Sequence, residues 1–130
     1  MGKNILKEKS FSFALRVVKL FQYLQNEKKE YILSKQLMRS GTSVGALYRE
    51  AEHAESKADF ICSAEHFVVH KLAIAQKECN ESLYWLELLN QSKIIDDNQF
   101  KSIYSDAEEL MKLITSIIKS TKLTINNYYA

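Results

Sequence analysis

The 130-residue sequence predicts an all-α protein, a single domain over residues 1–130 that folds as an up-down-up-down four-helix bundle. Three observations favour this fold class. Apolar residues recur at helical spacing in four segments, no segment alternates like a strand, and the chain contains no proline. The connections between the four segments are short, so successive helices should be antiparallel neighbours.

The first two helices are predicted over residues 10–27 and from Ser34 to Ala54. In the first, apolar residues recur every three or four positions between Phe13 and Leu24 and form a wide stripe. The second has Ser34 at the position of an N-cap. Small residues dominate its stripe, so a neighbouring helix can approach it closely.

A long third helix is predicted from near Ser56 or Asp59 to Leu89 and would measure about 50 Å. It carries two apolar stripes, whereas packing within one bundle buries one. Because exposed apolar patches of several hundred Å² mark interaction surfaces, we predict that the second stripe forms the interface of a homo-oligomer. The members of that stripe are Phe60, Phe67, Ile74, Trp85 and Leu88.

The fourth helix follows a break at residues 90–93, and Asp96 or Asp97 can cap its start. Residues 125–130 are expected to fray. Cys62 and Cys79 would lie about 25 Å apart along the third helix, too far for a disulfide.

The segment 39–46, Arg-Ser-Gly-Thr-Ser-Val-Gly-Ala, places Gly41 and Gly45 four residues apart on one face of the second helix. A glycine inside a helix costs about 1 kcal/mol relative to alanine. Two explanations are open: another helix comes very close, or the backbone and the nearby hydroxyls contact a ligand. We predict that both glycines serve helix packing.

No residue pattern indicates an enzyme, and neither a cofactor nor a metal is expected. A di-iron bundle needs two Glu-x-x-His pairs, and the chain has one, Glu50 with His53. His66 and His70 have the spacing of a zinc helix, but Phe67 occupies the position of the general base. The glycines of 39–46 match neither a P-loop nor a dinucleotide-binding fingerprint.

The net charge of +2 is weak evidence for any partner. Residues 1–32 are more basic, with seven Lys or Arg against three Glu, and such a surplus can contact nucleic acid or can be a solvated helix face. No apolar run approaches the ~20 residues of a membrane span, and we expect a soluble cytoplasmic protein. The candidate nucleic-acid contacts are Lys7, Lys9, Arg16, Lys19, Arg39, Arg49 and Lys119, of which Arg39 could instead join helices through Glu50 or Glu81.

Several segments resemble the small four-helix-bundle proteins encoded in intervening sequences of large-subunit ribosomal RNA genes, a family related to the accessory protein of diversity-generating retroelements. The resemblance spans residues 9–90 and is carried by 9–14, 37–46, 50–51, 56–60, 75–82 and Tyr84-Trp85-Leu86. It implies a ring-like homo-oligomer, typically a pentamer. In the retroelement branch it also implies nucleic-acid binding beside a reverse transcriptase.

The chain departs from that family in two ways. It is less basic than the retroelement protein, and residues 62–69 are additional, which we expect to lengthen the third helix. Two hypotheses follow. The first is a non-enzymatic oligomeric four-helix-bundle protein that binds RNA or a ribonucleoprotein partner. The alternative is a structural oligomeric adaptor that contacts only protein.

Overall fold

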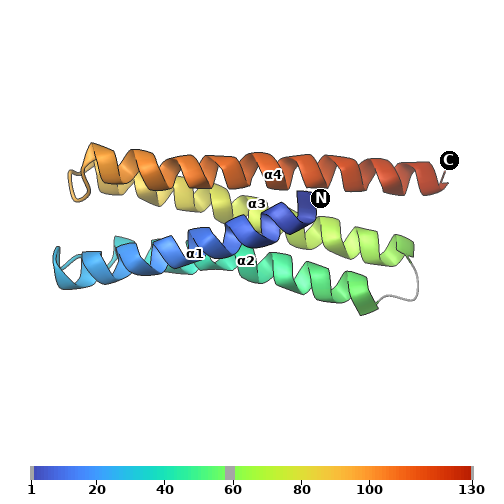
Figure 1. Cartoon of the computed structure of the whole chain (residues 1–130), viewed down its shortest axis with the longest axis horizontal. Coiled ribbons are helices and arrows are strands. Elements are labelled where there is room, and N and C mark those ends of the chain that lie inside the picture. Colours follow the sequence, from blue (N-terminus) through green and yellow to red (C-terminus); the bar gives the residue numbers. More distant parts are fainter. Residues whose placement is uncertain (1, 58–60, 130) are drawn as a thin grey trace.

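The computed structural model describes residues 2–57 and 61–129, with the backbone alone for residues 57 and 61–64. Its four helices are α1 (Gly2–Asn26), α2 (Leu33–Lys57), α3 (Ile61–Gln91) and α4 (Asp97–Tyr129). They lie along one long axis, and successive helices run in opposite directions (Figure 1). The predicted all-α four-helix bundle is therefore confirmed.

The start of α1 was placed too late by the sequence pattern. The helix begins at Gly2, eight residues before the predicted start at residue 10. Leu6 and Ser10 extend the stripe of Phe13 and Val17 by two further turns, and all four side chains are buried. The Ser10 hydroxyl is satisfied by donating to the Lys7 carbonyl at 3.2 Å, so a buried serine does not interrupt the helix.

The start of α2 is capped by Glu30 and not, as predicted, by Ser34. The Glu30 carboxylate accepts hydrogen bonds from the backbone N–H groups of Ile32, Leu33 and Ser34 at 3.1, 3.0 and 2.6 Å. Partial burial acts to raise the pKa of Glu30, but these N–H donors outweigh it and the pKa is lowered. The negative charge is thus held against the positive end of the helix dipole.

The start of α4 agrees with the prediction for Asp96. Its carboxylate accepts from Gln99 N at 2.8 Å, and Gln99 Oε1 accepts from Asp96 N at 3.0 Å. This reciprocal pair is a capping box. The helix then continues to Tyr129, so residues 125–129 are helical and the expected fraying is wrong.

The start of α3 and the end of α4 extend the bundle beyond the start of α1. Residues 62–69 lie in the continuous helix Ile61–Gln91, as predicted for the additional segment. In Figure 1, α4 runs well past the N-terminus of α1. The bundle is therefore four helices thick at one end and loses α1 at the other.

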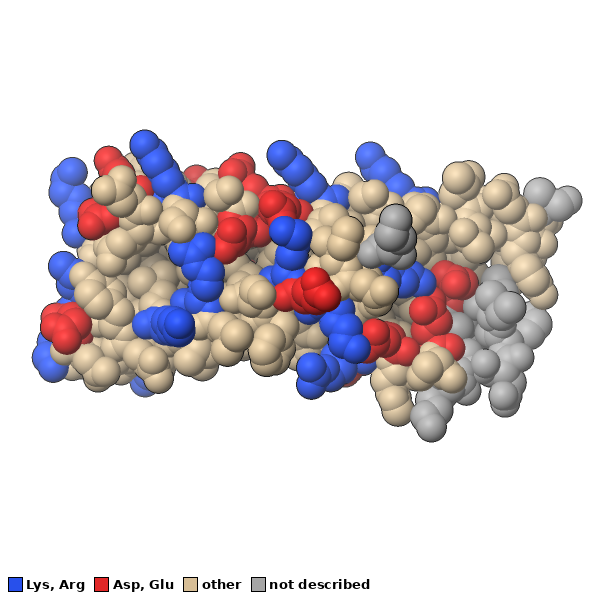
Figure 2. Space-filling model, viewed as in Figure 1, with Lys and Arg blue, Asp and Glu red and all other residues tan. Residues whose placement is uncertain are grey.

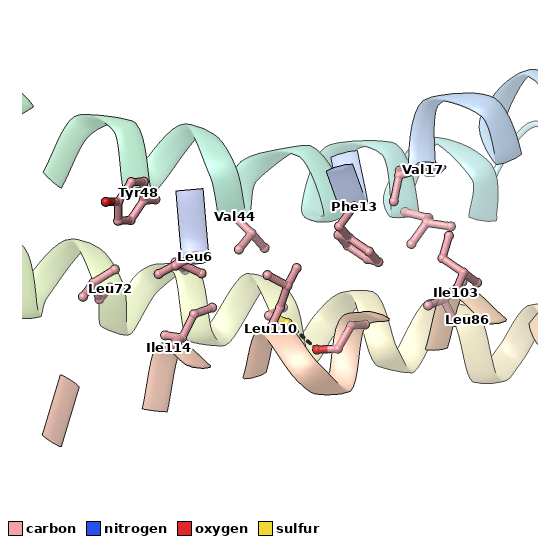
Figure 3. Packing of buried hydrophobic residues seen from close by; sticks show 14 of the residues in the cluster. Leu6, Phe13, Val17, Val44, Tyr48, Leu72, Leu86, Ile103, Leu110 and Ile114 are labelled. Atoms are coloured by element: carbon pink, nitrogen blue, oxygen red, sulfur yellow. Dashed lines mark hydrogen bonds between the residues drawn. The ribbon is translucent and has the colours of Figure 1, made fainter. Parts of the chain in front are cut away.

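The core runs along the bundle axis and contains side chains from all four helices, among them Phe13, Val44, Leu86 and Leu110 (Figure 3). Each of these four is at most 1% exposed. Cys79 is buried in the same core and its thiol donates to the Ala107 carbonyl at 3.3 Å. Burial raises the pKa of this thiol to about 12, so it stays protonated and unreactive near neutral pH.

Both glycines of the segment 39–46 lie inside α2 and face α1. A Cβ built on Gly41 would lie 2.8 Å from Val17 Cγ2, closer than real Cβ atoms come to a neighbour. A Cβ on Gly45 would lie 3.4 Å from Ser10 Oγ and 3.5 Å from the Ser10 backbone. Gly41 therefore allows the close approach of the two helices. A Cβ at Gly45 would lie at the short end of ordinary van der Waals distances from Ser10.

Candidate functional site

A groove with a volume of about 600 Å³ lies between α1 and α2. Phe11 and Ala14 line it from α1, and Gly45 and Ala46 line it from α2. Because three of these residues have a methyl group or no side chain, the two helices leave a hollow beside Phe11. Charged side chains, including Lys7 and Arg49, form its rim.

The outward face of α1 next to this groove carries two exposed apolar side chains. Phe11 and Leu15, one turn apart, are 55% and 50% exposed. Phe13 and Val17 lie on the opposite side of the same helix and are buried. We call the exposed pair and the groove together the α1–α2 face. This face was not predicted from the sequence, although an apolar pair at i, i+4 outside the buried stripe is a signal for it.

The second stripe of α3, predicted as the oligomer interface, is only partly available. Phe67 is 40% exposed, but Ile74, Trp85 and Leu88 are half-buried. Trp85 packs against the core of its own chain and its Nε1 donates to Glu81 Oε2 at 3.1 Å. Phe60 lies outside the described residues. The stripe therefore offers less apolar surface than its sequence indicates.

Four of the seven candidate nucleic-acid contacts form ion pairs with carboxylates on other helices: Lys7, Lys9, Arg16 and Arg39. Lys7 pairs with Glu52 of α2 at 3.1 Å, and Lys9 pairs with Glu109 of α4. Arg16 contacts Asp106 of α4 at 2.5 Å and the Ser102 carbonyl at 3.2 Å. Figure 2 shows the resulting mixture of blue and red side chains over the face in view. Three candidates form no ion pair within the described part of the chain: Lys19, Arg49 and Lys119.

Arg39 joins α2 to α3 by binding two carboxylates. Its guanidinium contacts Glu78 at 3.0 Å and also pairs with Glu81. Glu81 is one of the two partners predicted for Arg39 from the sequence. Glu81 in turn accepts from Trp85. The remaining predicted partner, Glu50, lies 3.6 Å from the ammonium of Lys71 instead. Arg39 is thus a structural contact between helices.

The chain resembles a family of proteins over nearly its whole length. A family model described as 23S rRNA-intervening sequence protein matches residues 2–116. The chain belongs to this family. A comparison with the curated proteins gave no match.

A solved structure supports the same assignment. The chain is 48% identical to a protein from Bacteroides thetaiotaomicron VPI-5482, with a TM-score of 0.83 over 92% of this chain and 99% of that one. That protein is described as having unknown function and as coming from the S23 ribosomal protein family. The likeness supports the fold and the family, while the function of this 23S rRNA-intervening sequence family member must be inferred from its surface.

The family match contains the α1–α2 face but stops within α4. Residues 117–129, which include the part of α4 that runs past α1, lie beyond it. Within the residues described, no cluster of three or more His, Cys, Asp or Glu side chains could hold a metal ion. No helix in that part of the chain is long and apolar enough to cross a membrane.

Proposed function

We propose that this protein is a non-enzymatic bundle that associates with further copies of itself through the α1–α2 face and binds RNA as an oligomer. The observation that carries the proposal is the exposure of Phe11 and Leu15 beside an apolar groove. A large aromatic side chain that is about half exposed to solvent can act as an anchor residue when a partner provides a pocket for it. A ring-like homo-oligomer, most simply a pentamer, agrees with the family resemblance.

Self-association is supported by what the groove rim contains. Lys7, Arg49, Glu50 and Glu52 line the groove; Lys7 pairs with Glu52 at 3.1 Å, and Glu50 lies 3.6 Å from the Lys71 ammonium. A surface that carries both signs of charge around an apolar centre can complement another copy of itself. Arg49 forms no ion pair within the described residues, so it is available to pair across the interface.

RNA binding is supported by the family and by the cations that remain unpaired. The matching family is named for an intervening sequence of 23S rRNA. A single chain has a net charge of only +2, so one copy would bind RNA weakly. Repetition of the same basic surface around an oligomer increases affinity without any new contact.

The rival function is a structural adaptor that contacts only protein. The ion pairs of Lys7, Lys9, Arg16 and Arg39 favour it, because they remove four predicted RNA contacts from the surface. RNA binding at low salt separates the two functions, since a protein-only adaptor shows none.

The self-association is tested by sedimentation velocity at micromolar protein. The parent protein is expected to sediment as an oligomer, and Phe11→Glu is expected to sediment as a folded monomer because it puts a charge at the centre of the interface. Phe67→Glu, which alters an exposed phenylalanine on α3, is the matched control and should remain oligomeric. A parent protein that sediments as a monomer contradicts the proposal. If Phe67→Glu alone loses association, the interface is the α3 stripe that the sequence predicted.

The RNA binding is tested by fluorescence anisotropy with a labelled single-stranded oligonucleotide. Binding should be largely independent of sequence and should weaken roughly tenfold or more between about 50 and 200 mM salt, because each phosphate contact releases counterions. Absence of binding at the lower salt concentration would favour the protein-only adaptor.

A further inference from the structure

Three lysines lie at the end of the bundle that holds the α1–α2 and α3–α4 turns. Lys28, Lys29 and Lys93 are exposed and form no ion pair within the described part of the chain. All three line one hollow of about 450 Å³. This end lies at the left of Figure 1, and the same end shows several blue side chains, with red ones beside them, in Figure 2. We call the hollow the turn-end site.

Two of these lysines occupy backbone positions that favour glycine. Lys29 and Lys93 have φ angles of 54° and 63° and are the non-glycine residues with positive φ among those described. At the end of α3, Lys93 N bonds to the Asn90 carbonyl and Ile94 N to the Leu89 carbonyl, both at 2.9 Å. This is the Schellman arrangement, in which glycine is the usual residue at the position of Lys93.

Three acidic residues at this end accept hydrogen bonds from backbone or amide donors, and a fourth, Glu27 next to Lys28, is exposed. Glu30, the acidic residue that lines the turn-end site, accepts three backbone N–H bonds at the start of α2. Asp96 accepts from Gln99 N, and Asp97 accepts from the Asn90 side chain at 3.0 Å. These three carboxylates hold the turns and helix starts in place, and within the described residues none of them pairs with Lys28, Lys29 or Lys93.

An aromatic and an aliphatic side chain lie beside the lysines. Tyr31 is 49% exposed and Ile32 is 74% exposed, and both line the turn-end site. Cationic groups next to an exposed aromatic ring are the arrangement by which proteins bind single-stranded nucleic acid, with phosphates on the cations and a base on the ring. A free phosphate would make no use of the ring.

We propose that the turn-end site binds single-stranded RNA, with Lys28, Lys29 and Lys93 on the phosphodiester backbone and Tyr31 stacked on a base. This inference rests on the proposed RNA binding and moves it from the sequence-predicted lysines to the opposite end of the bundle. Lys7 and Lys9 lie near the start of α1, whereas Lys28 and Lys29 follow its end. The two locations can be tested separately.

The experiment compares two triple variants by anisotropy with a labelled oligouridylate of about 12 nucleotides, long enough for one site of this kind. Lys28→Gln/Lys29→Gln/Lys93→Gln should weaken binding about tenfold or more at low salt. Its plot of log affinity against log salt should be shallower by about 2, since each lost contact removes about 0.7. Lys9→Gln/Lys119→Gln/Lys122→Gln removes the same charge away from the turn-end site, leaves the α1–α2 face intact and should bind nearly as the parent does.

A further pair of substitutions separates binding from folding. Lys29→Gly/Lys93→Gly relieves both positive-φ positions, so its melting temperature should rise while its RNA affinity falls. Tyr31→Ala should weaken binding with little change in the salt dependence. A variant with a higher melting temperature and lower affinity cannot owe its lost binding to misfolding.

Each outcome either supports the site or overturns it. If the parent binds RNA and the turn-end triple variant binds equally well, the turn-end site is wrong while RNA binding stands. If the parent fails to bind the oligonucleotide, both proposals fail. Binding of inorganic phosphate or of phosphatidylserine vesicles, without binding of the oligonucleotide, would assign the lysines to a different anion and overturn the assignment to RNA.

Discussion

The Gly41→Leu variant is expected to lose the folded bundle. A Cβ at this position would already lie 2.8 Å from Val17 Cγ2 and 3.0 Å from Val17 Cγ1. Val17 is fully buried, and its branched side chain is fixed in a helix, so it cannot move aside. A larger side chain must therefore push α1 away from α2. Circular dichroism during thermal unfolding should show a variant that is unfolded or melts far below the parent.

Gly41→Ala places a smaller side chain at the same position and should destabilise the bundle less. Overpacking by one methyl group costs about 1–3 kcal/mol, and the better helix propensity of alanine returns about 1 kcal/mol. Gly45→Ala is the matched control, because its Cβ would contact Ser10 at an ordinary 3.4–3.5 Å, so it should be neutral or more stable than the parent by up to about 1 kcal/mol. Val17→Ala combined with Gly41→Ala should recover part of the loss, as a double-mutant cycle would detect. A Gly41→Leu protein that melts like the parent would show that α1 and α2 do not touch at this point.

The four helices could be predicted from apolar spacing and the cap of α4 from Asp96, but the start of α1 and the cap of α2 could not. The buried stripe of α1 continues through Leu6, but the helix was predicted to begin only at residue 10, after the charged residues Lys7, Glu8 and Lys9. At α2, Ser34 has the residue type of an N-cap, whereas Glu30 reaches the helix start from outside it. Helix ends depend on how the preceding turn folds back, and spacing along the chain carries no information about that.

The functional surfaces could be predicted less well, because they depend on which helix faces which. Periodicity shows that Trp85 shares a face with Phe67, but its burial depends on the packing of α3 against the rest of the bundle. Likewise, Lys9 is a cation in the sequence, and its partner Glu109 lies a hundred residues further along the chain. The glycine segment was found because a pair of glycines in a helix is locally costly, and such a cost is visible in the sequence alone.

Phe13→Ala and Phe11→Ala are expected to separate folding from association, because the two residues differ mainly in the direction they face. Phe13 is 1% exposed in the core, and its truncation should lower the free energy of unfolding by about 3–5 kcal/mol. Phe11 is 55% exposed, and its truncation should leave the stability of the single bundle within about 0.5 kcal/mol. Thermal unfolding of both variants over a range of protein concentrations measures the two effects together.

The concentration dependence decides what Phe11 does. A protein stabilised by association melts at a higher temperature when its concentration is raised. The Phe13→Ala variant should keep that dependence around a lower melting temperature, because its α1–α2 face is intact. The Phe11→Ala variant should lose the dependence and melt as the dilute parent does. If Phe11→Ala keeps it, the exposed ring of Phe11 is not part of the interface, and the contact between copies must be sought on another face of the bundle.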